Sequence, residues 1–189
     1  MSYTEFLGLK PGDVVAIVGS GGKTTLLWQL AAENRDRRVL VSTTTKMMCP
    51  TAEERAGIEL LHGPIEGEKI TAPDMDALRA ASAEAELTLI ECDGAKRLPL
   101  KGWADHEPVV PDFATVTIGV LPLWPLGHPV GEEIVHRVEA FCALTGAKLG
   151  DPVTSDHLIR VITHPDGLFR RARGRQILYL NHWPGGETP

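Results

Sequence analysis

The sequence predicts an α/β fold of the P-loop NTPase type, with a mostly parallel sheet and helices on both faces. Three observations predict it. A glycine-rich turn follows an apolar run near the N-terminus, strand-like and helix-like segments alternate afterwards, and polar clusters follow several of the apolar runs. With 189 residues, of which 43% are hydrophobic, the chain has the size and composition of one domain with a substantial core, so residues 1–189 are expected to form a single domain.

The first element pair lies within residues 13–34. The apolar run Val14–Val18 indicates a buried strand, and apolar residues at positions 26, 27, 30 and 31 indicate an amphipathic helix. Between them stand the turn residues Gly19, Ser20, Gly21 and Gly22 and then Lys23, Thr24 and Thr25.

Phosphate binding is the chemistry that this turn predicts. Glycines let backbone N–H groups converge on an anion, and the helix N-terminus adds partial positive charge. From an exposed turn, Lys23 would reach the terminal phosphates, and the Thr24 hydroxyl is suited to Mg²⁺. The alternative is a glycine turn that binds nothing, but Lys-Thr-Thr between a strand and a helix argues against it. The spacing G-x-x-G-K-T-T is tighter than the usual P-loop and resembles that of Mur-type and folylpolyglutamate ligases.

The remaining elements follow in order along the chain. Strands are predicted at residues 38–42, 87–90, 114–121 and 176–180, with a weaker one at 58–61, and helices at 74–85, 134–144 and 156–163. In parallel sheets, ligands gather at the carboxyl ends of the strands. Three polar segments are expected to meet there, namely Gly19–Thr25, Thr43–Lys46 and Glu91–Lys96.

Glu91 and Asp93 follow an apolar strand, as the acidic motif of a P-loop NTPase does. In a regular strand both side chains point to the same side, so one carboxylate could hold Mg²⁺ while the other polarises a water molecule or a substrate group. The alternative is a pair of acidic residues at a solvated strand end. The pattern does not decide which carboxylate is nearer the metal.

The segment Thr43–Lys46 follows the second strand. The hydroxyls of Thr44 and Thr45 could bind Mg²⁺, water or phosphate, and Lys46 could neutralise charge on a transferred phosphoryl group. Alternatively, these β-branched threonines simply continue the strand.

Charge also concentrates around the irregular stretch Arg97–Pro111. Its functional interpretation is a substrate-facing loop with an anion-binding part and an acid–base pair, His106 and Glu107. The alternative is an exposed charged loop. The charged residues are Lys96, Arg97, Lys101, His106 and Glu107.

Composition excludes several classes of protein. The net charge of −6 argues against broad binding to nucleic acid or anionic membranes, and no apolar run is long enough for a transmembrane helix. The N-terminal sequence lacks an export signal, so a cytoplasmic location with reduced cysteines is expected. The seven histidines form no metal-binding pattern, Cys92 is expected to be a buried cysteine at a strand end, and the basic run Arg170–Arg175 is expected at a solvated helix C-terminus.

The motifs together resemble the YqeC family, described as accessory proteins of selenium-dependent molybdenum hydroxylases. The resemblance is carried, in order, by GLKPGDVVAIVGSGGKTTLL, VLVSTTTKM, ECDGAKRLPLK and ADHEPVVP, and runs from about Leu7 to the final strand. It implies a P-loop NTPase-like fold and a role in maturing a molybdenum hydroxylase, with that enzyme or its cofactor-maturation proteins as partners.

The resemblance also assigns residues. The family's phosphate loop falls on Gly19, Gly21, Gly22, Lys23 and Thr24, and its other motifs fall on Thr44, Thr45 and Lys46, on Glu91, Asp93, Gly94 and Ala95, and on His106, Glu107 and Pro108. Two features depart from the family pattern. Cys92 stands where a small residue is usual, and Asn181-His182-Trp183-Pro184 lacks the acidic residue of an Asn-x-x-Asp base-reading segment. The sequence therefore does not decide whether the nucleotide is ATP or GTP.

The leading hypothesis is an accessory protein that binds a nucleoside triphosphate and Mg²⁺ and carries out hydrolysis or phosphoryl transfer. One alternative is a small-molecule kinase or a Mur-like ATP-dependent ligase. Another is a non-catalytic, nucleotide-gated scaffold.

Overall fold

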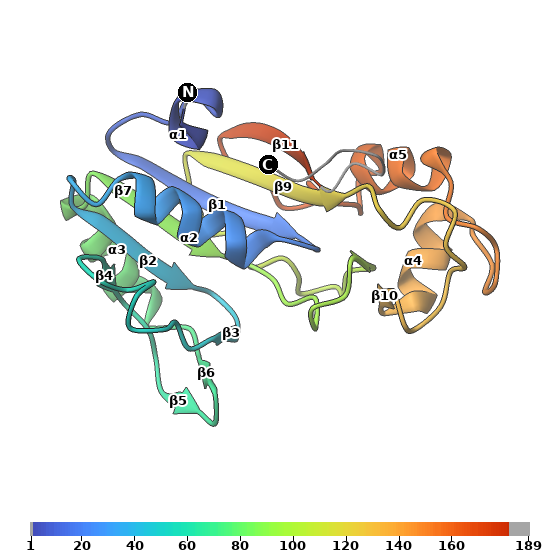
Figure 1. Cartoon of the computed structure of the whole chain (residues 1–189), viewed down its shortest axis with the longest axis horizontal. Coiled ribbons are helices and arrows are strands. Elements are labelled where there is room, and N and C mark those ends of the chain that lie inside the picture. The colour runs from blue at the N-terminus through green and yellow to red at the C-terminus, as the bar shows by residue number, and fades with distance from the viewer. Residues whose placement is uncertain (1, 182–189) are drawn as a thin grey trace.

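A six-stranded parallel sheet forms the centre of the computed structural model, which describes residues 2–181 (Figure 1). Hydrogen bonding orders its strands β11-β9-β1-β7-β2-β4. Their bounds are β1 Asp13–Gly19, β2 Val39–Thr43, β4 Glu59–Leu60, β7 Leu87–Glu91, β9 Val116–Pro122 and β11 Arg175–Asn181. The predicted α/β class with a mostly parallel sheet is confirmed, and the weak strand candidate at 58–61 becomes the edge strand β4.

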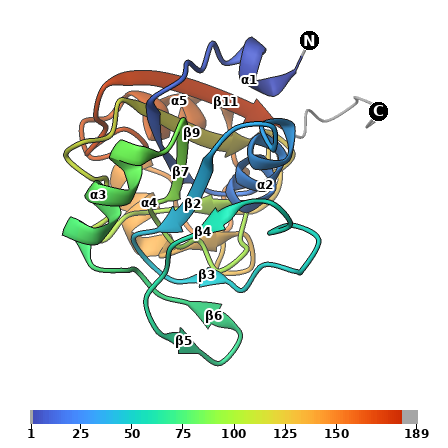
Figure 2. The same ribbon diagram turned by 90° about the vertical axis from the view of Figure 1, so that its left-hand side faces the viewer.

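Helices cover both faces of this sheet (Figures 1 and 2). Along β1, Val15 and Ile17 pack with Leu27 and Leu30, while alternate residues face the opposite core, because successive strand side chains point to opposite faces. The core that contains Val15 and Ile17 lies between the sheet and α2 (Lys23–Glu33), and α2 contacts α1 (Tyr3–Phe6). The core on the opposite face of the sheet includes residues of α3 (Met75–Glu84), α4 (Val138–Thr145) and α5 (Ser155–Thr163). None of the helices within residues 2–181 is long and apolar enough to cross a membrane.

The sheet brings the predicted polar segments to one edge. β7 lies between β1 and β2, and Glu91 is in register with Ile17 on one side and Thr43 on the other. The three strands therefore end together, and the turns that follow them are neighbours in space. This confirms the predicted meeting of the three segments, which follows from parallel pairing.

Two small sheets were not predicted from the sequence. One is antiparallel, with β3 (Met47–Met48), β6 (Lys69–Ile70) and β5 (Ile65–Glu66), and projects beyond the main sheet (Figure 2). The other pairs β8 (Leu100–Lys101) with β10 (Val135–His136) in parallel. Strands of two residues are too short to show a hydrophobic period, which is why pattern analysis misses them.

The helix predicted at 134–144 begins four residues later than expected. Val135 and His136 pair with β8 through backbone hydrogen bonds, Leu100 N–H to Ile134 O and Gly102 N–H to His136 O. Arg137 then adopts a left-handed φ of 57°, and α4 begins at Val138. Backbone pairing with a distant segment overrides the local helical period.

The prediction that Arg170–Arg175 forms a helix C-terminus is wrong. α5 already ends at Thr163, and the arginines instead bind backbone carbonyl oxygens of other segments. Arg170 donates to Ala104 O, Arg171 donates to Asp105 O, and Arg175 donates to Leu7 O and Gly8 O. The basic run therefore ties distant loops together.

Candidate functional site

The turn between β1 and α2 has a backbone conformation that favours glycine at its three glycine positions. Their φ angles are 101° at Gly19, 62° at Gly21 and 129° at Gly22, a region that L-residues rarely adopt. A Cβ at Gly19 would lie 2.2 Å from the carbonyl oxygen of Val120, and one at Gly22 would lie 2.4 Å from Nδ2 of Asn181. Backbone conformation therefore favours glycine at all three positions, and at Gly19 the fixed backbone of Val120 also leaves no room for a side chain.

The turn leaves the N-terminus of α2 available to a ligand. The helix begins at Lys23 with Gly22 as N-cap, and no side chain caps it. Within residues 2–181, the backbone N–H groups of residues 21–25 form no hydrogen bond, and these residues line a pocket. Converging N–H groups at the positive end of a helix form an anion-binding nest.

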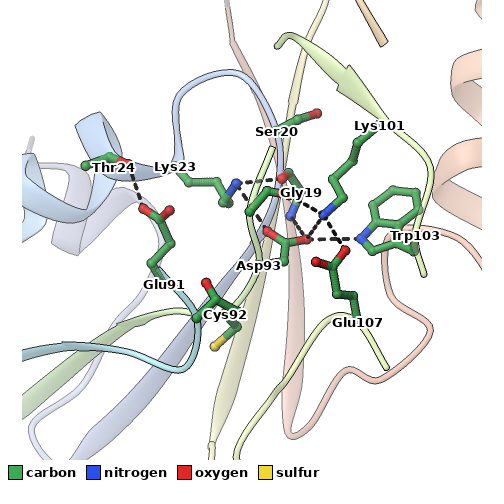
Figure 3. Close-up of polar contacts among 12 residues, drawn as sticks. Gly19, Ser20, Lys23, Thr24, Glu91, Cys92, Asp93, Lys101, Trp103 and Glu107 are labelled. Atoms are coloured by element: carbon green, nitrogen blue, oxygen red, sulfur yellow. Dashed lines mark hydrogen bonds and ion pairs between the residues drawn. The ribbon is translucent and has the colours of Figure 1, made fainter. Parts of the chain in front are cut away.

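Lys23 points inward rather than out from an exposed turn, contrary to the sequence-based expectation. Its Nζ donates to Gly19 O at 2.7 Å and lies 3.2 Å from Oδ1 of Asp93, both contacts being drawn in Figure 3. The Lys23 side chain is only 5% exposed. Burial lowers the pKa of the Lys23 ammonium, but the charges of Asp93 and Glu91 outweigh burial and leave the pKa raised. Lys23 therefore stays charged beneath the turn.

Glu91 pairs with the first turn of α2. The Thr24 hydroxyl donates to Oε2 of Glu91 at 2.6 Å (Figure 3). Glu91, although mostly buried, lines the pocket. Burial raises the pKa of the Glu91 carboxyl, and Lys23 and Thr24 offset this only in part. A hydroxyl and a carboxylate oxygen thus stand together at the open side of the site.

Asp93 has different surroundings, and it is fully buried. Its Oδ2 accepts from the Gly19 N–H at 3.1 Å, from Trp103 Nε1 at 3.0 Å and from Lys101 Nζ at 3.2 Å. Burial alone would raise the pKa of this carboxyl, but Lys23 and Lys101 hold it below its ordinary value.

Glu91 and Asp93 therefore do not act as the matched pair that a regular strand predicts. β7 ends at Glu91, so strand alternation does not extend to Asp93. Figure 3 shows the two carboxylates directed at separate partners, Thr24 for one and Lys101 with Trp103 for the other. Only Glu91 lines the pocket.

A chain of buried charges extends from Asp93 along the loop that follows. Lys101 is fully buried and donates to Gly94 O at 2.6 Å and to Oε2 of Glu107 at 3.1 Å. Glu107 in turn accepts two hydrogen bonds from Arg137, at 2.7 and 3.1 Å. Glu107 is thus committed to two cations.

The predicted acid–base pair of His106 and Glu107 is not formed. His106 is exposed at the pocket wall, and no hydrogen bond joins it to Glu107 in the described part of the chain. The catalytic role of His106 stays a prediction, while the buried position of Glu107 gives it a structural role toward Lys101 and Arg137.

Sequence reasoning did not assign Trp103 and Arg137 to the site. Arg137 lay inside a predicted helix, and a lone tryptophan in a loop gives no pattern. Lys101 was noted only among the charged residues of the loop, and its position directly after the apolar run at residues 98–100 is the signal that could have indicated a buried lysine.

The segment Thr43–Lys46 divides between the sheet and the pocket. The hydroxyls of Thr43 and Thr44 donate to backbone oxygens, Glu91 O at 2.9 Å and Val109 O at 2.6 Å, so they are structural. Thr45 Oγ1 is buried at the pocket wall with no partner among residues 2–181, and Lys46 forms an exposed ion pair with Glu66 there. Thr45 and Lys46 are the members of the segment that line the pocket.

One pocket of about 950 Å³ is lined by residues 21–25 together with Thr45, Lys46, Glu91, His106, Glu107 and Arg137. This is near the upper end of the ~300–1,000 Å³ range of ligand sites. Six Lys and Arg side chains and three Glu side chains line it, although the whole chain carries a net charge of −6. Cys92, by contrast, is buried in the core as expected, and burial raises the pKa of its thiol.

The oxygens of Thr24 and Glu91 fit a hard divalent cation. Mg²⁺ is commonly held by one or two carboxylates together with water and substrate phosphates rather than by an all-protein cage. In residues 2–181, no group of three or more His, Cys, Asp or Glu side chains is arranged to hold a metal ion. The site therefore suits Mg²⁺ that is shared with a bound phosphate.

Comparison with known proteins gives two matches and one negative result. The family model described as YqeC protein matches residues 15–139. A curated relative, the uncharacterized protein YqeC of Escherichia coli (strain K12), is 32% identical over 206 residues, which cover 95% of this chain and 79% of the relative. No solved structure matches the chain.

Proposed function

This chain belongs to the YqeC family, and we propose that it binds a nucleoside triphosphate with Mg²⁺ at the turn Gly19–Thr25. One observation carries the proposal. The uncapped N-terminus of α2 lies in the same pocket as the Thr24–Glu91 oxygen pair, and Lys23 sits directly beneath the turn. This combination offers amide donors, a cation and metal ligands to one polyphosphate.

In this proposal each group around the turn has a separate role toward the triphosphate. The amides of residues 21–25 cradle phosphate oxygens, and Lys23 supplies charge from below while Asp93 keeps it ionised. Thr24 and Glu91 hold Mg²⁺, which supplies charge neutralisation at the terminal phosphates when it is bound. Lys46 and Thr45 line the same pocket, and the contact proposed for them is with the terminal phosphoryl group.

The biological role that we propose is that of an accessory protein for maturation of a selenium-dependent molybdenum hydroxylase. The support for this role is family resemblance, and the proposed coupling is hydrolysis or phosphoryl transfer from the triphosphate. A small-molecule kinase or ligase is the second candidate, and the basic lining of the pocket beyond the phosphate turn favours it, because an acceptor needs a binding site of its own.

Calorimetric titration of ATP and GTP, with and without Mg²⁺, tests the nucleotide site. Thr24→Val should abolish the gain in affinity that Mg²⁺ provides and change metal-free affinity less than twofold, because only the hydroxyl is removed. Thr163→Val, an exposed helical threonine outside the pocket, is the matched control. Equal Mg²⁺ dependence in the parent and in Thr24→Val would reject the metal assignment, and no binding of either nucleotide by the parent would reject the site.

Complementation tests the accessory role. In cells that lack the parent gene, hydroxylase activity should return with the parent and not with Lys23→Ala, provided that both proteins accumulate equally. Full rescue by a Lys23→Ala protein that no longer binds nucleotide would show that the maturation role does not depend on the triphosphate.

A further inference from the structure

Three basic residues of the pocket adopt a backbone conformation that is unfavourable for them. Lys96, Arg97 and Arg137 have φ angles of 49°, 63° and 57°, and they are the non-glycine residues with positive φ in the described part of the chain. All three line the pocket. Non-glycine residues persist in this region only where the surrounding structure demands it, and such positions cluster at functional sites.

Lys96 and Arg97 form the two central positions of a tight turn. The Leu98 N–H donates to Ala95 O at 2.8 Å, and positive φ at both central residues is the pattern of a type I′ turn. Asn-Gly is the sequence that forms this turn at least cost. Lys96 and Arg97 therefore occupy two positions whose backbone conformation is unfavourable for residues with long side chains.

These two side chains have no partner in the described part of the chain to account for them. Both are exposed, and within residues 2–181 neither forms a hydrogen bond or an ion pair. The neighbouring Gly94 has open space around it. A strained turn that presents unpaired positive charge to a pocket has the form of an anion receptor.

Arg137 adds a third cation from another element, in a fixed orientation. It precedes α4 as the N-cap, no side chain caps that helix, and Glu107 holds its guanidinium by two hydrogen bonds. An arginine has five N–H donors, so donors remain for a ligand. Next to it, His136 lies among positive charges: burial, followed by Arg137, Lys101 and Lys96, lowers its pKa to about 4.

We propose that Lys96, Arg97 and Arg137 bind the phosphate group of a second, phosphate-bearing small molecule in the same pocket as the nucleotide. The two unpaired charges of Lys96 and Arg97 match a phosphate monoester, which approaches −2 near neutral pH, better than a single carboxylate. Arg137, whose charge is balanced by Glu107, adds N–H donors. The inference rests on the proposed nucleotide site, because it assigns the remaining part of that pocket to an acceptor or effector.

Replacing Lys96-Arg97 by Asn-Gly tests the proposal. This double variant keeps the turn and relieves its strain, so its urea midpoint should equal or exceed that of the parent. The dissociation constant of inorganic phosphate should rise at least tenfold, while nucleotide affinity should change less than threefold. Lys10→Asn with Lys148→Asn removes the same charge at exposed positions outside the pocket and should leave phosphate binding unchanged.

Two further measurements distinguish phosphate binding at Lys96, Arg97 and Arg137 from phosphate binding at the turn Gly19–Thr25. Binding should persist in Lys23→Ala and in the parent saturated with a non-hydrolysable triphosphate. Binding that disappears in both conditions but survives in the Asn-Gly variant would place phosphate at the nucleotide turn and overturn the inference, leaving the proposed function intact. An equal loss of nucleotide affinity in the Asn-Gly variant would also overturn it. If the parent binds no triphosphate, the proposed function fails, and the comparison of phosphate binding between parent and Asn-Gly variant still decides this inference.

Discussion

Glu91 and Asp93 are two residues apart, yet they belong to regions of opposite character. Glu91 faces the pocket, accepts one hydrogen bond from Thr24 and has a raised pKa because of burial. Asp93 is fully buried, accepts from three donors and has a pKa held down by Lys23 and Lys101 in spite of burial. Acidic residues of one motif can therefore be divided between the wall of a pocket and the buried frame of the site.

Removing Lys101 should have the largest effect on stability, because Lys101 pairs with two buried carboxylates, Asp93 and Glu107. Lys101→Met leaves Asp93 short of one partner and Glu107 dependent on Arg137 alone. The free energy of unfolding should fall by about 3–5 kcal/mol, the usual cost of removing one member of a buried ion pair. Urea denaturation measures it.

Lys46→Met is the matched control, since Lys46 pairs with Glu66 at the surface. Exposed pairs contribute about 0–1 kcal/mol. Equal losses in the two variants would show that burial does not distinguish the two lysines.

Exchanging each carboxylate for its amide tests whether Glu91 and Asp93 have different roles. Asp93→Asn places an NH₂ group among N–H donors and should lower the free energy of unfolding by about 2–4 kcal/mol. Glu91→Gln should cost less than about 1 kcal/mol, because burial already disfavours the Glu91 charge, but it should abolish the Mg²⁺-dependent gain in nucleotide affinity. Urea denaturation and calorimetry on the same samples give both values, and the reverse pattern would assign the metal to Asp93.

Gly19 connects the two regions, since its N–H binds Asp93 and its carbonyl accepts from Lys23. Gly19→Ala should cost about 2–3 kcal/mol, because a Cβ would meet the Val120 carbonyl oxygen at 2.2 Å in addition to the strain at a φ of 101°. Gly12→Ala has a comparable φ of 85° but open space, so it isolates the strain at about 1 kcal/mol. Similar thermal shifts in the two variants would contradict the close packing of the turn.

The pH dependence of stability should show the smallest effect, with opposite signs for the two groups. The depressed pKa of Asp93 stabilises the fold above its ordinary value of 3.8, and this contribution is lost as pH falls below that value and through the folded pKa. The raised pKa of Glu91 favours the fold below its ordinary value of 4.5, and this contribution is lost as pH rises through the folded pKa. We expect the urea midpoint to fall less between pH 7 and pH 3 in Asp93→Asn than in the parent. We also expect the difference in urea midpoint between the parent and Glu91→Gln to shift in favour of the parent as pH falls toward 4.5.

Local patterns in the sequence were enough to predict the glycine turn, the alternation of strands and helices, and the edge where Gly19–Thr25, Thr43–Lys46 and Glu91–Lys96 meet. They could do so because a glycine turn between an apolar run and an amphipathic helix is a local structure, and because parallel strands end at the same edge of a sheet. The base-reading prediction at residues 182–184 lies outside the described residues.

Only the tertiary structure decided which carboxylate faces the pocket, where Lys101, Trp103 and Arg137 lie, and that residues 135–136 pair as a strand. Each of these depends on contacts between segments far apart along the chain, such as Arg137 with Glu107 or Asp93 with Gly19. Burial and charge pairing are properties of the packed molecule, because they depend on which groups exclude water from a side chain. For that reason two acidic residues that look equivalent in the motif Glu-Cys-Asp acquire opposite pKa shifts once the chain has folded.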